Sequence, residues 1–179
     1  MRQALDRFYR ISGGIGAFFI AAICVTVLIQ VSFNLIDRIA QLTTGKAYGL
    51  VLPSYAEFAG YFLAAGTFFA LADTLQSGNH IRVNLVIQRV SGKARNVIEA
   101  WCCLLGATFS AYFTYWATNH AYESFVFGDL SPGIVPVPLW IPQVSMILGL
   151  VALTICFVDL FFQVLAGRNP DYLSQSEEL

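Results

Sequence analysis

The stretch YAEFAGYFLAAGTFFALADTL, residues 55–75, decides the fold of this chain. Its only charged residues are Glu57 and Asp73, which lie close to its two ends. A helix of about 20 apolar residues crosses the roughly 30 Å of hydrocarbon in a bilayer, so this stretch predicts a membrane-spanning helix. The sequence that follows, QSGNHIRVNLVIQRVSGKAR, residues 76–95, is polar and basic and ends the span.

The composition also indicates an integral membrane protein. The 179 residues are 57% hydrophobic and 12% charged, whereas an average soluble domain is about 25% charged. Apolar runs predict four spans, at residues 11–36, 54–75, 94–122 and 139–165. The first run is too long for the apolar core of a signal peptide, so we expect it to stay as a span. The fold class is therefore an all-α integral membrane protein with a single membrane domain.

The positions of Lys and Arg predict how the chain faces, because basic loops stay in the cytoplasm. Only Arg38 and Lys46 lie on one side, in the polar connection 37–53, where we expect a turn after a short surface helix. The other side holds all the remaining basic residues: Arg2, Arg7, Arg10, Arg82, Arg89, Lys93, Arg95 and Arg168. We therefore expect both termini to be cytoplasmic, with a short polar tail at residues 169–179.

The basic linker between spans two and three predicts a short amphipathic helix at about residues 83–91. Its apolar residues recur at helical spacing, whereas Asn84 and Arg89 face elsewhere. Such a helix can lie at the acyl boundary of the membrane or against a helix of a partner. The residues of the apolar face are Val83, Val86, Ile87 and Val90.

Small residues predict the faces on which the spans pack, because they let neighbouring helices approach closely. These residues are Ala56, Gly60 and Ala64 in the second span, Gly106 and Ser110 in the third, and Gly149 in the fourth. Trp140 opens the fourth span, where we expect it to anchor the helix at the membrane interface. The four cysteines lie inside apolar runs, which favours small buried hydrophobes over disulfides or a metal site.

The sequence offers no convergent set of groups for catalysis. His80 and His120 map to opposite membrane faces, so they cannot ligate one haem, and no phosphate-binding or nucleophile motif is present. We therefore predict no enzyme activity, no cofactor and no metal site. The net charge of −1 gives no reason to expect nucleic-acid binding.

A self-sufficient transporter is also disfavoured, because its ionisable groups should lie near the bilayer midplane. Here the acidic residues lie near the ends of the spans. Solvated or paired end carboxylates are favoured over an ion pathway. For Asp73, which the dipole at the helix C-terminus disfavours, His80 and Arg82 are candidate partners.

The chain resembles the small, four-span membrane subunit (Q, or DctQ-like) of tripartite ATP-independent periplasmic (TRAP) transporters. The similar features are the acidic residue of Tyr55-Ala56-Glu57, the run from Gly66 to Asp73 followed by Gly78-Asn79-His80-Ile81-Arg82-Val83-Asn84, and the Pro138-Leu139-Trp140 entry to span four. Asn84 stands where the family usually has Asp, which puts a salt bridge there in doubt. The first outer loop is also longer than is usual in the family.

The resemblance implies an accessory role in a bacterial inner membrane. In this family the small subunit binds a large membrane (M) subunit, which holds the substrate and sodium sites. A periplasmic substrate-binding protein delivers an organic acid, such as a dicarboxylate. We expect the small subunit to brace the large subunit, to contact membrane lipids and to carry no transport site itself. The alternative is a self-associating tetraspan scaffold protein.

Two residue-level hypotheses follow from the resemblance and the charge pattern. In the first, His80, Arg82 and Asn84 hold the exit of span two against the interfacial helix, while Arg89 belongs to the same basic surface. The alternative is that His80 and Arg82 only face phosphate headgroups. In the second, Glu57 and the outer loops contact the substrate-binding protein.

Overall fold

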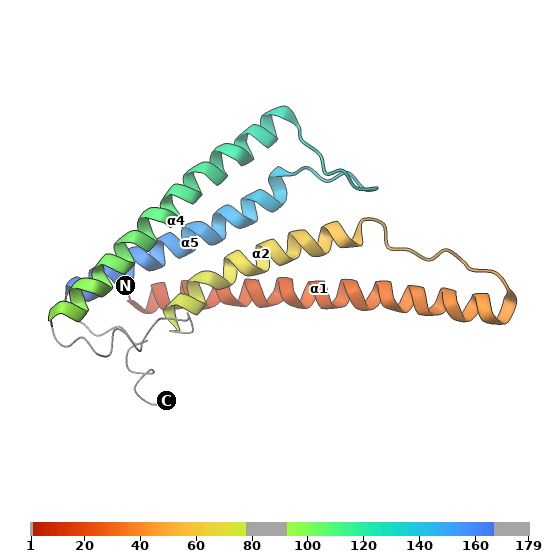
Figure 1. Ribbon diagram of the computed structural model, residues 1–179, viewed down its shortest axis with the longest axis horizontal. Coiled ribbons are helices and arrows are strands. Elements are labelled where there is room, and N and C mark those ends of the chain that lie inside the picture. The colour runs from red at the N-terminus through yellow and green to blue at the C-terminus, as the bar shows by residue number, and fades with distance from the viewer. Residues whose placement is uncertain (1, 78–92, 167–179) are drawn as a thin grey trace.

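The structure, a computed structural model, describes residues 2–77 and 93–166. It contains four helices, α1 (Arg2–Thr44), α2 (Tyr55–Gln76), α4 (Lys93–Phe127) and α5 (Trp140–Leu165). Figure 1 shows two helical hairpins, α1 with α2 and α4 with α5, which converge near the N-terminus and diverge away from it. We call these two ends of the molecule the convergent end and the open end. The hairpins meet through α2 and α5.

All four helices are long and apolar enough to cross a membrane. This confirms the prediction of an all-α chain with four candidate spans. The start of α1 and the end of α5 both lie at the convergent end (Figure 1). The interfacial helix expected at residues 83–91 and the tail at 169–179 lie outside the described residues, and the cytoplasmic placement of the termini stays a prediction.

Helix α1 is much longer than the span expected at residues 11–36. It continues to Thr44 because the sequence after Ile36 has no Gly or Pro before Gly45. Gly45 has a φ of 72°, a left-handed conformation that commonly ends helices. The short helix that we expected at the start of the connection 37–53 is therefore the continuous end of α1.

A close backbone approach joins α1 to α2. A Cβ on Gly16 would lie 2.9 Å from the carbonyl oxygen of Gly66, so glycine is needed at this crossing. Nearby, the Ser12 hydroxyl donates a hydrogen bond of 2.7 Å to the carbonyl of Phe69. The rings of Phe19 and Phe69 stack with their centroids 6.2 Å apart.

Two glycines allow α5 to pack against both of its neighbours. A Cβ on Gly149 would lie 2.5 Å from the backbone carbonyl carbon of Phe68 in α2. A Cβ on Gly106 in α4 would lie 2.5 Å from the Phe157 ring of α5. Ser110, one turn along α4, is buried, and its hydroxyl bonds within its own helix. All three residues belong to the small-residue faces named from the sequence.

The small-residue face expected in α2 is not used against another helix of this chain in the same way. Ala56 and Gly60 are exposed and Ala64 is half-buried. A Cβ on Gly60 would meet nothing within 4 Å. Helix α2 instead uses Gly66, on a different side, to approach α1.

The buried core lies in the convergent half of the molecule. Cys103 and Cys156 are part of it, whereas Cys24 and Cys102 are exposed, and all four cysteines are free. Apolar packing therefore holds the hairpins together at the convergent end, and other contacts must join them at the open end. The core residues are Tyr9, Ala72, Leu75, Cys103, Ala152, Cys156 and Leu160.

Candidate functional site

A loop between α4 and α5 fastens the two hairpins together at the open end. The Ser131 hydroxyl in this loop donates a hydrogen bond of 3.2 Å to Glu57 Oε2 in the first turn of α2. The Val135 amide donates a bond of 3.0 Å to the hydroxyl of Ser54, which precedes α2. We call the contact formed by Ser54, Glu57, Ser131, Gly133 and Val135 the clasp.

Gly133 lets the Glu57 carboxylate lie against the backbone at the centre of the clasp. A Cβ on Gly133 would overlap the carboxylate of Glu57, so the carboxylate lies directly over the backbone of the loop. On the other side of the contact, Ser54 has a φ of 56°. This left-handed conformation is uncommon outside Gly, Asn and Asp, and it lies immediately before the helix that carries Glu57.

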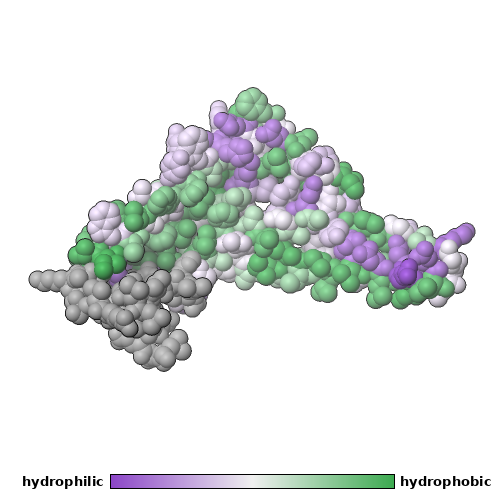
Figure 2. All heavy atoms as spheres, viewed as in Figure 1, coloured by the Kyte–Doolittle hydropathy of each residue, from purple (hydrophilic) through white to green (hydrophobic). Residues whose placement is uncertain are grey.

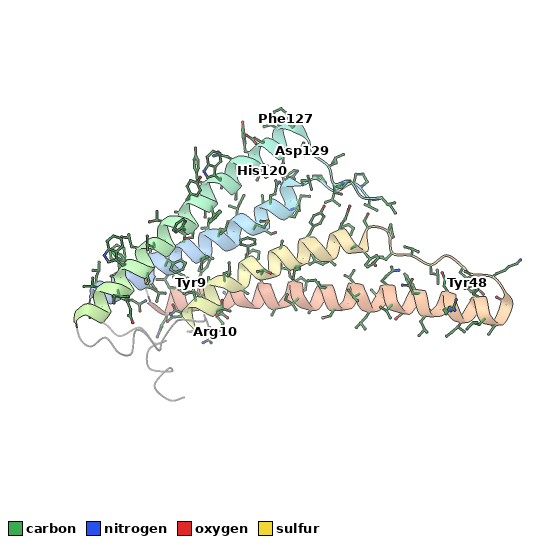
Figure 3. The ribbon with its side chains drawn as sticks, viewed as in Figure 1. Tyr9, Arg10, Tyr48, His120, Phe127 and Asp129 are labelled. Carbon is green, nitrogen blue, oxygen red and sulfur yellow. The ribbon has the colours of Figure 1, made fainter. Side chains whose placement is uncertain are left out.

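The loop itself is ordered by internal backbone contacts. The Ser131 amide donates to the carbonyl of Val137 at 2.9 Å, and the Leu139 amide donates to the carbonyl of Asp129 at 3.0 Å. An isolated antiparallel bridge pairs Leu130 with Pro138. Figure 3 shows Phe127 at the end of α4 and Asp129 just after it, where the loop begins. These contacts present the loop to α2 as a preformed turn.

An apolar cavity of about 180 Å³ lies beside the clasp, between the two hairpins. Side chains of α1, α2, the loop and α5 line it, including Phe19, Phe58, Val137 and Ile141. The hairpins are thus bridged over a gap rather than packed tightly at this end. Trp140 is half-buried at the start of α5, and its ring packs edge-on against Phe125, with centroids 5.8 Å apart.

Polar side chains also join the helices at the convergent end. The amide of Gln76 in α2 donates a bond of 3.3 Å to Asp6 Oδ1 in α1. A Cβ on Gly13 would overlap the carboxylate of Asp73, so this carboxylate lies against the backbone of α1. The thiol of Cys156 in α5 contacts the carbonyl of Ala72 at 3.6 Å.

Tyr9 lies at the centre of this convergent end, as Figure 3 shows. Its side chain is fully buried, and its hydroxyl has no hydrogen-bond partner among residues 2–77 and 93–166. Nearby in α5, the amide of Gln163 donates a bond of 2.8 Å to Asp159 Oδ2.

Some of the predicted site residues lie in contacts between elements, whereas others lie outside the described residues. Glu57 and Asp73 each lie in a contact between elements, and Trp140 lies at the start of α5. Four others, His80, Arg82, Asn84 and Arg89, lie outside the described residues. Sequence reasoning missed the clasp partners Ser54, Ser131 and Gly133. Their only local signal was a turn-rich loop containing glycine and proline.

The described part of the chain offers no arrangement that would hold a metal ion. No group of three His, Cys, Asp or Glu side chains comes together within residues 2–77 and 93–166. The carboxylates of Asp6, Glu57 and Asp159 instead accept hydrogen bonds from neighbouring side chains.

Comparison with known proteins agrees with this arrangement. Residues 47–167 match the family described as tripartite ATP-independent periplasmic transporters, DctQ component. The chain belongs to this family. No match was found among the curated proteins or among the solved structures.

Membership in the DctQ family makes the chain a small-subunit component of a TRAP transporter and a multi-pass membrane protein. The family is a family of transporter components and not of enzymes. The match includes α2, α4 and α5, and it begins after the end of α1. Both sides of the clasp, Ser54 with Glu57 and Ser131 to Val135, lie within the matched region.

Proposed function

We propose that this DctQ component is the bracing subunit of a sodium-coupled TRAP transporter for organic acids. It would hold the large membrane subunit in place in the bacterial inner membrane and carry no transport site. Both termini and the convergent end would be cytoplasmic, and the clasp would face the periplasm. The large subunit would bind sodium and substrate, and a periplasmic substrate-binding protein would deliver the substrate.

The observation that carries this proposal is that the hairpins are fastened at both ends. The apolar core and the contact of the Cys156 thiol in α5 with the carbonyl of Ala72 in α2 hold the convergent end, and the clasp holds the open end. Domain motions need an interface that can slide or a hinge that can bend. A bundle fixed at both ends resists such motion, which suits a static scaffold beside a moving partner.

The exposed small-residue face of α2 is a candidate contact for the large subunit. Ala56 and Gly60 leave room for another helix to approach the backbone closely. Because no helix of the described chain fills that space at Gly60, a Gly60→Leu substitution should weaken assembly with the large subunit while leaving this subunit folded. Unchanged co-purification of the large subunit would count against this contact.

The bracing role can be tested by reconstitution. The subunit should co-purify with the large subunit from native membranes, and proteoliposomes should take up substrate only when both subunits and the binding protein are present. Uptake by the large subunit alone at the full rate would reject the bracing role. Recovery of this subunit only as an oligomer of itself would favour the alternative of a tetraspan scaffold.

The linker residues stay part of the proposal. Arg82, with His80 and Asn84, would hold the exit of α2 against the interfacial helix, and Arg89 would contribute to the same surface. Replacing Arg82 with Ala should then reduce assembly or transport, whereas Arg82→Lys should retain both if only headgroup attraction matters. Wild-type assembly and transport in Arg82→Ala would exclude this role.

Crosslinking tests the proposed contact with the substrate-binding protein. Probes in the loop between α4 and α5 should reach the binding protein during turnover, since the clasp places this loop at the open end. Crosslinks that reach only the large subunit would show that this loop serves subunit assembly instead.

A further inference from the structure

A second hollow, of about 450 Å³, lies on the surface of the spans where α2, α4 and α5 meet. It shares no lining residue with the cavity beside the clasp. The rings of Phe113 and Trp116 are 58% and 55% exposed, so the hollow is open to the surroundings of the chain. Apart from one histidine, its lining is apolar or aromatic. The lining residues include Phe68 of α2, Phe113, Trp116, Ala117 and His120 of α4, and Leu150 of α5.

The single ionisable residue of the hollow lies at one end of it. Helix α4 runs from the convergent end to the open end (Figure 1), so His120 lies about 10 Å nearer the open end than Phe113. Figure 3 shows His120 on the outer part of α4. In Figure 2, hydrophilic residues gather near the open end of α4, and mainly hydrophobic residues lie between the hairpins farther in. The polar and apolar parts of the hollow therefore follow one another along the span.

Glu123 extends the polar end of the hollow into a rim. Nδ1 of His120 lies 3.9 Å from Oε2 of Glu123, and the two side chains are 70% and 66% exposed. This distance is longer than a hydrogen bond, so both side chains can still bind a further group. An imidazole N–H can donate to a phosphate oxygen, and a carboxylate can accept from an ammonium group. The rim therefore offers a donor for an anion beside an acceptor for a cation.

The rim and the hollow lie at different depths of the span. His120 and Glu123 lie close to the outer end of the span predicted at residues 94–122, and α4 ends at Phe127. Polar side chains near the ends of spans reach toward the headgroups. Leu150, in contrast, lies about 15 Å from the start of α5, at the depth of the hydrocarbon. The rim is thus at headgroup level and the hollow is at acyl-chain level.

This order of groups matches a phospholipid and narrows the choice of headgroup. A cavity of about 150 Å³ already binds benzene, so the hollow has room for a longer stretch of hydrocarbon. An anionic headgroup that lacks an amine would place its phosphate beside the Glu123 carboxylate, and like charges repel. A choline headgroup has no N–H to donate. An ethanolamine headgroup carries both a phosphate for His120 and an ammonium with three N–H donors for Glu123.

We infer that the hollow and its rim form a binding site for one phospholipid with an ethanolamine headgroup, in the leaflet at the open end. One acyl chain lies in the hollow between the hairpins. The phosphate accepts a hydrogen bond from His120, and the ammonium donates to Glu123. The site consists of this chain alone, so the inference goes beyond the bracing role and its test does not depend on that role.

Fluorescence of Trp116, which lines the hollow, reports which lipid occupies it. Trp101→Phe and Trp140→Phe together leave Trp116 as the only tryptophan of the chain. The full-length variant is placed in bilayers of equal parts ethanolamine and glycerol phospholipids, with quenching bromine atoms on the acyl chains of one or the other. The brominated ethanolamine lipid should quench Trp116 more, with a preference of up to about fivefold, the upper range for an exposed ion pair.

A variant that keeps only Trp101 is the matched control for ordinary lipid contact. Trp101 lies on the same helix and is 59% exposed, but it does not line the hollow. Both brominated lipids should quench it equally. Equal quenching of Trp116 by both lipids would show ordinary surface lipid and overturn the inference. Loss of Trp116 quenching when the large subunit is present would also overturn it, because a protein segment would then fill the hollow.

Two substitutions separate the acyl chain from the headgroup. Ala117→Phe fills the hollow and should abolish the lipid preference at Trp116, whereas Ala111→Phe, an exposed position on α4 outside the lining, should retain it. Glu123→Gln removes the acceptor charge for the ammonium, so it should abolish the preference for ethanolamine while Trp116 is still quenched by both lipids. A preference that survives both Ala117→Phe and Glu123→Gln would reject the site.

Discussion

Gly149→Ala should destabilise the subunit strongly, because it adds one methyl group where two helix backbones meet. The new Cβ would lie 2.5 Å from the backbone carbonyl carbon and 2.6 Å from the carbonyl oxygen of Phe68. A flexible side chain could turn away from such an overlap, but backbone atoms in the middle of α2 cannot. Helix α5 must therefore move away from α2 by roughly an ångström.

The expected cost follows from packing. Overpacking of a well-packed core costs about 1–3 kcal/mol, and separation of the helices would also weaken contacts among the buried neighbours of Gly149 in α5. The gain in helix propensity from Gly to Ala offsets about 0.5–1 kcal/mol of this. We expect a net loss of about 1–2 kcal/mol, which corresponds to a fall in Tm of about 2–8 °C for a chain of this size.

Gly60→Ala is the matched control for this prediction. It makes the same chemical change in the interior of a neighbouring helix, but the added Cβ meets nothing within 4 Å. It should raise stability by about 0.5–1 kcal/mol through helix propensity alone. Thermal unfolding of both variants in the same detergent, followed by tryptophan fluorescence, compares them directly. A Gly149→Ala variant as stable as the wild type would refute the close contact between α2 and α5.

Three further predictions address the clasp, the α1–α2 contact and the segment that follows α1. Gly133→Ala should displace the carboxylate of Glu57 and lower the free energy of unfolding by about 1.5–3 kcal/mol, the range for a hydrogen bond to a charged group. In a Glu57→Ala background, the same substitution should lower stability little further. Additive losses of Tm in the double variant would show that the clasp is not one unit. Ser12→Ala should cost about 0.6–2 kcal/mol by removing an interhelical hydrogen bond, and an unchanged Tm would count against that bond. Asp37→Ala should release the segment after α1, because the amides of Tyr48 and Leu50 donate hydrogen bonds to the Asp37 carboxylate. Trypsin cleavage after Lys46 should then be faster, with cleavage at the wild-type rate as the contrary result.

The four helices could be predicted from the sequence because span length and apolar composition are local properties. Residues 55–75 contain enough apolar residues to cross a bilayer whatever surrounds them, and the same holds for the other runs. The family could be recognised because its signals, from Glu57 to Trp140, are local motifs in a fixed order. The length of α1 was missed because the polar sequence from Asp37 onward was taken to end the span and to form a separate short helix, although it contains no helix breaker before Gly45.

The packing partners could not be predicted, because they depend on how distant helices align. Gly60, Gly66 and Gly149 look alike in the sequence, yet the first faces open space and the other two face neighbouring backbones. Small residues permit a close approach without specifying which helix makes it. The register of α2 against α1 and α5 decides which glycine is used, and no local pattern contains that register.

Glu57 has a local explanation in the sequence and a different, long-range role in the structure. From the sequence alone, a carboxylate in the first turn of a helix is explained by the helix dipole, and no partner is needed. In the structure its partner, Ser131, is 74 residues away in the chain, and Gly133 provides the space for the carboxylate. Such a long-range contact matters most where the apolar core is absent, and the clasp lies at the open end, far from that core.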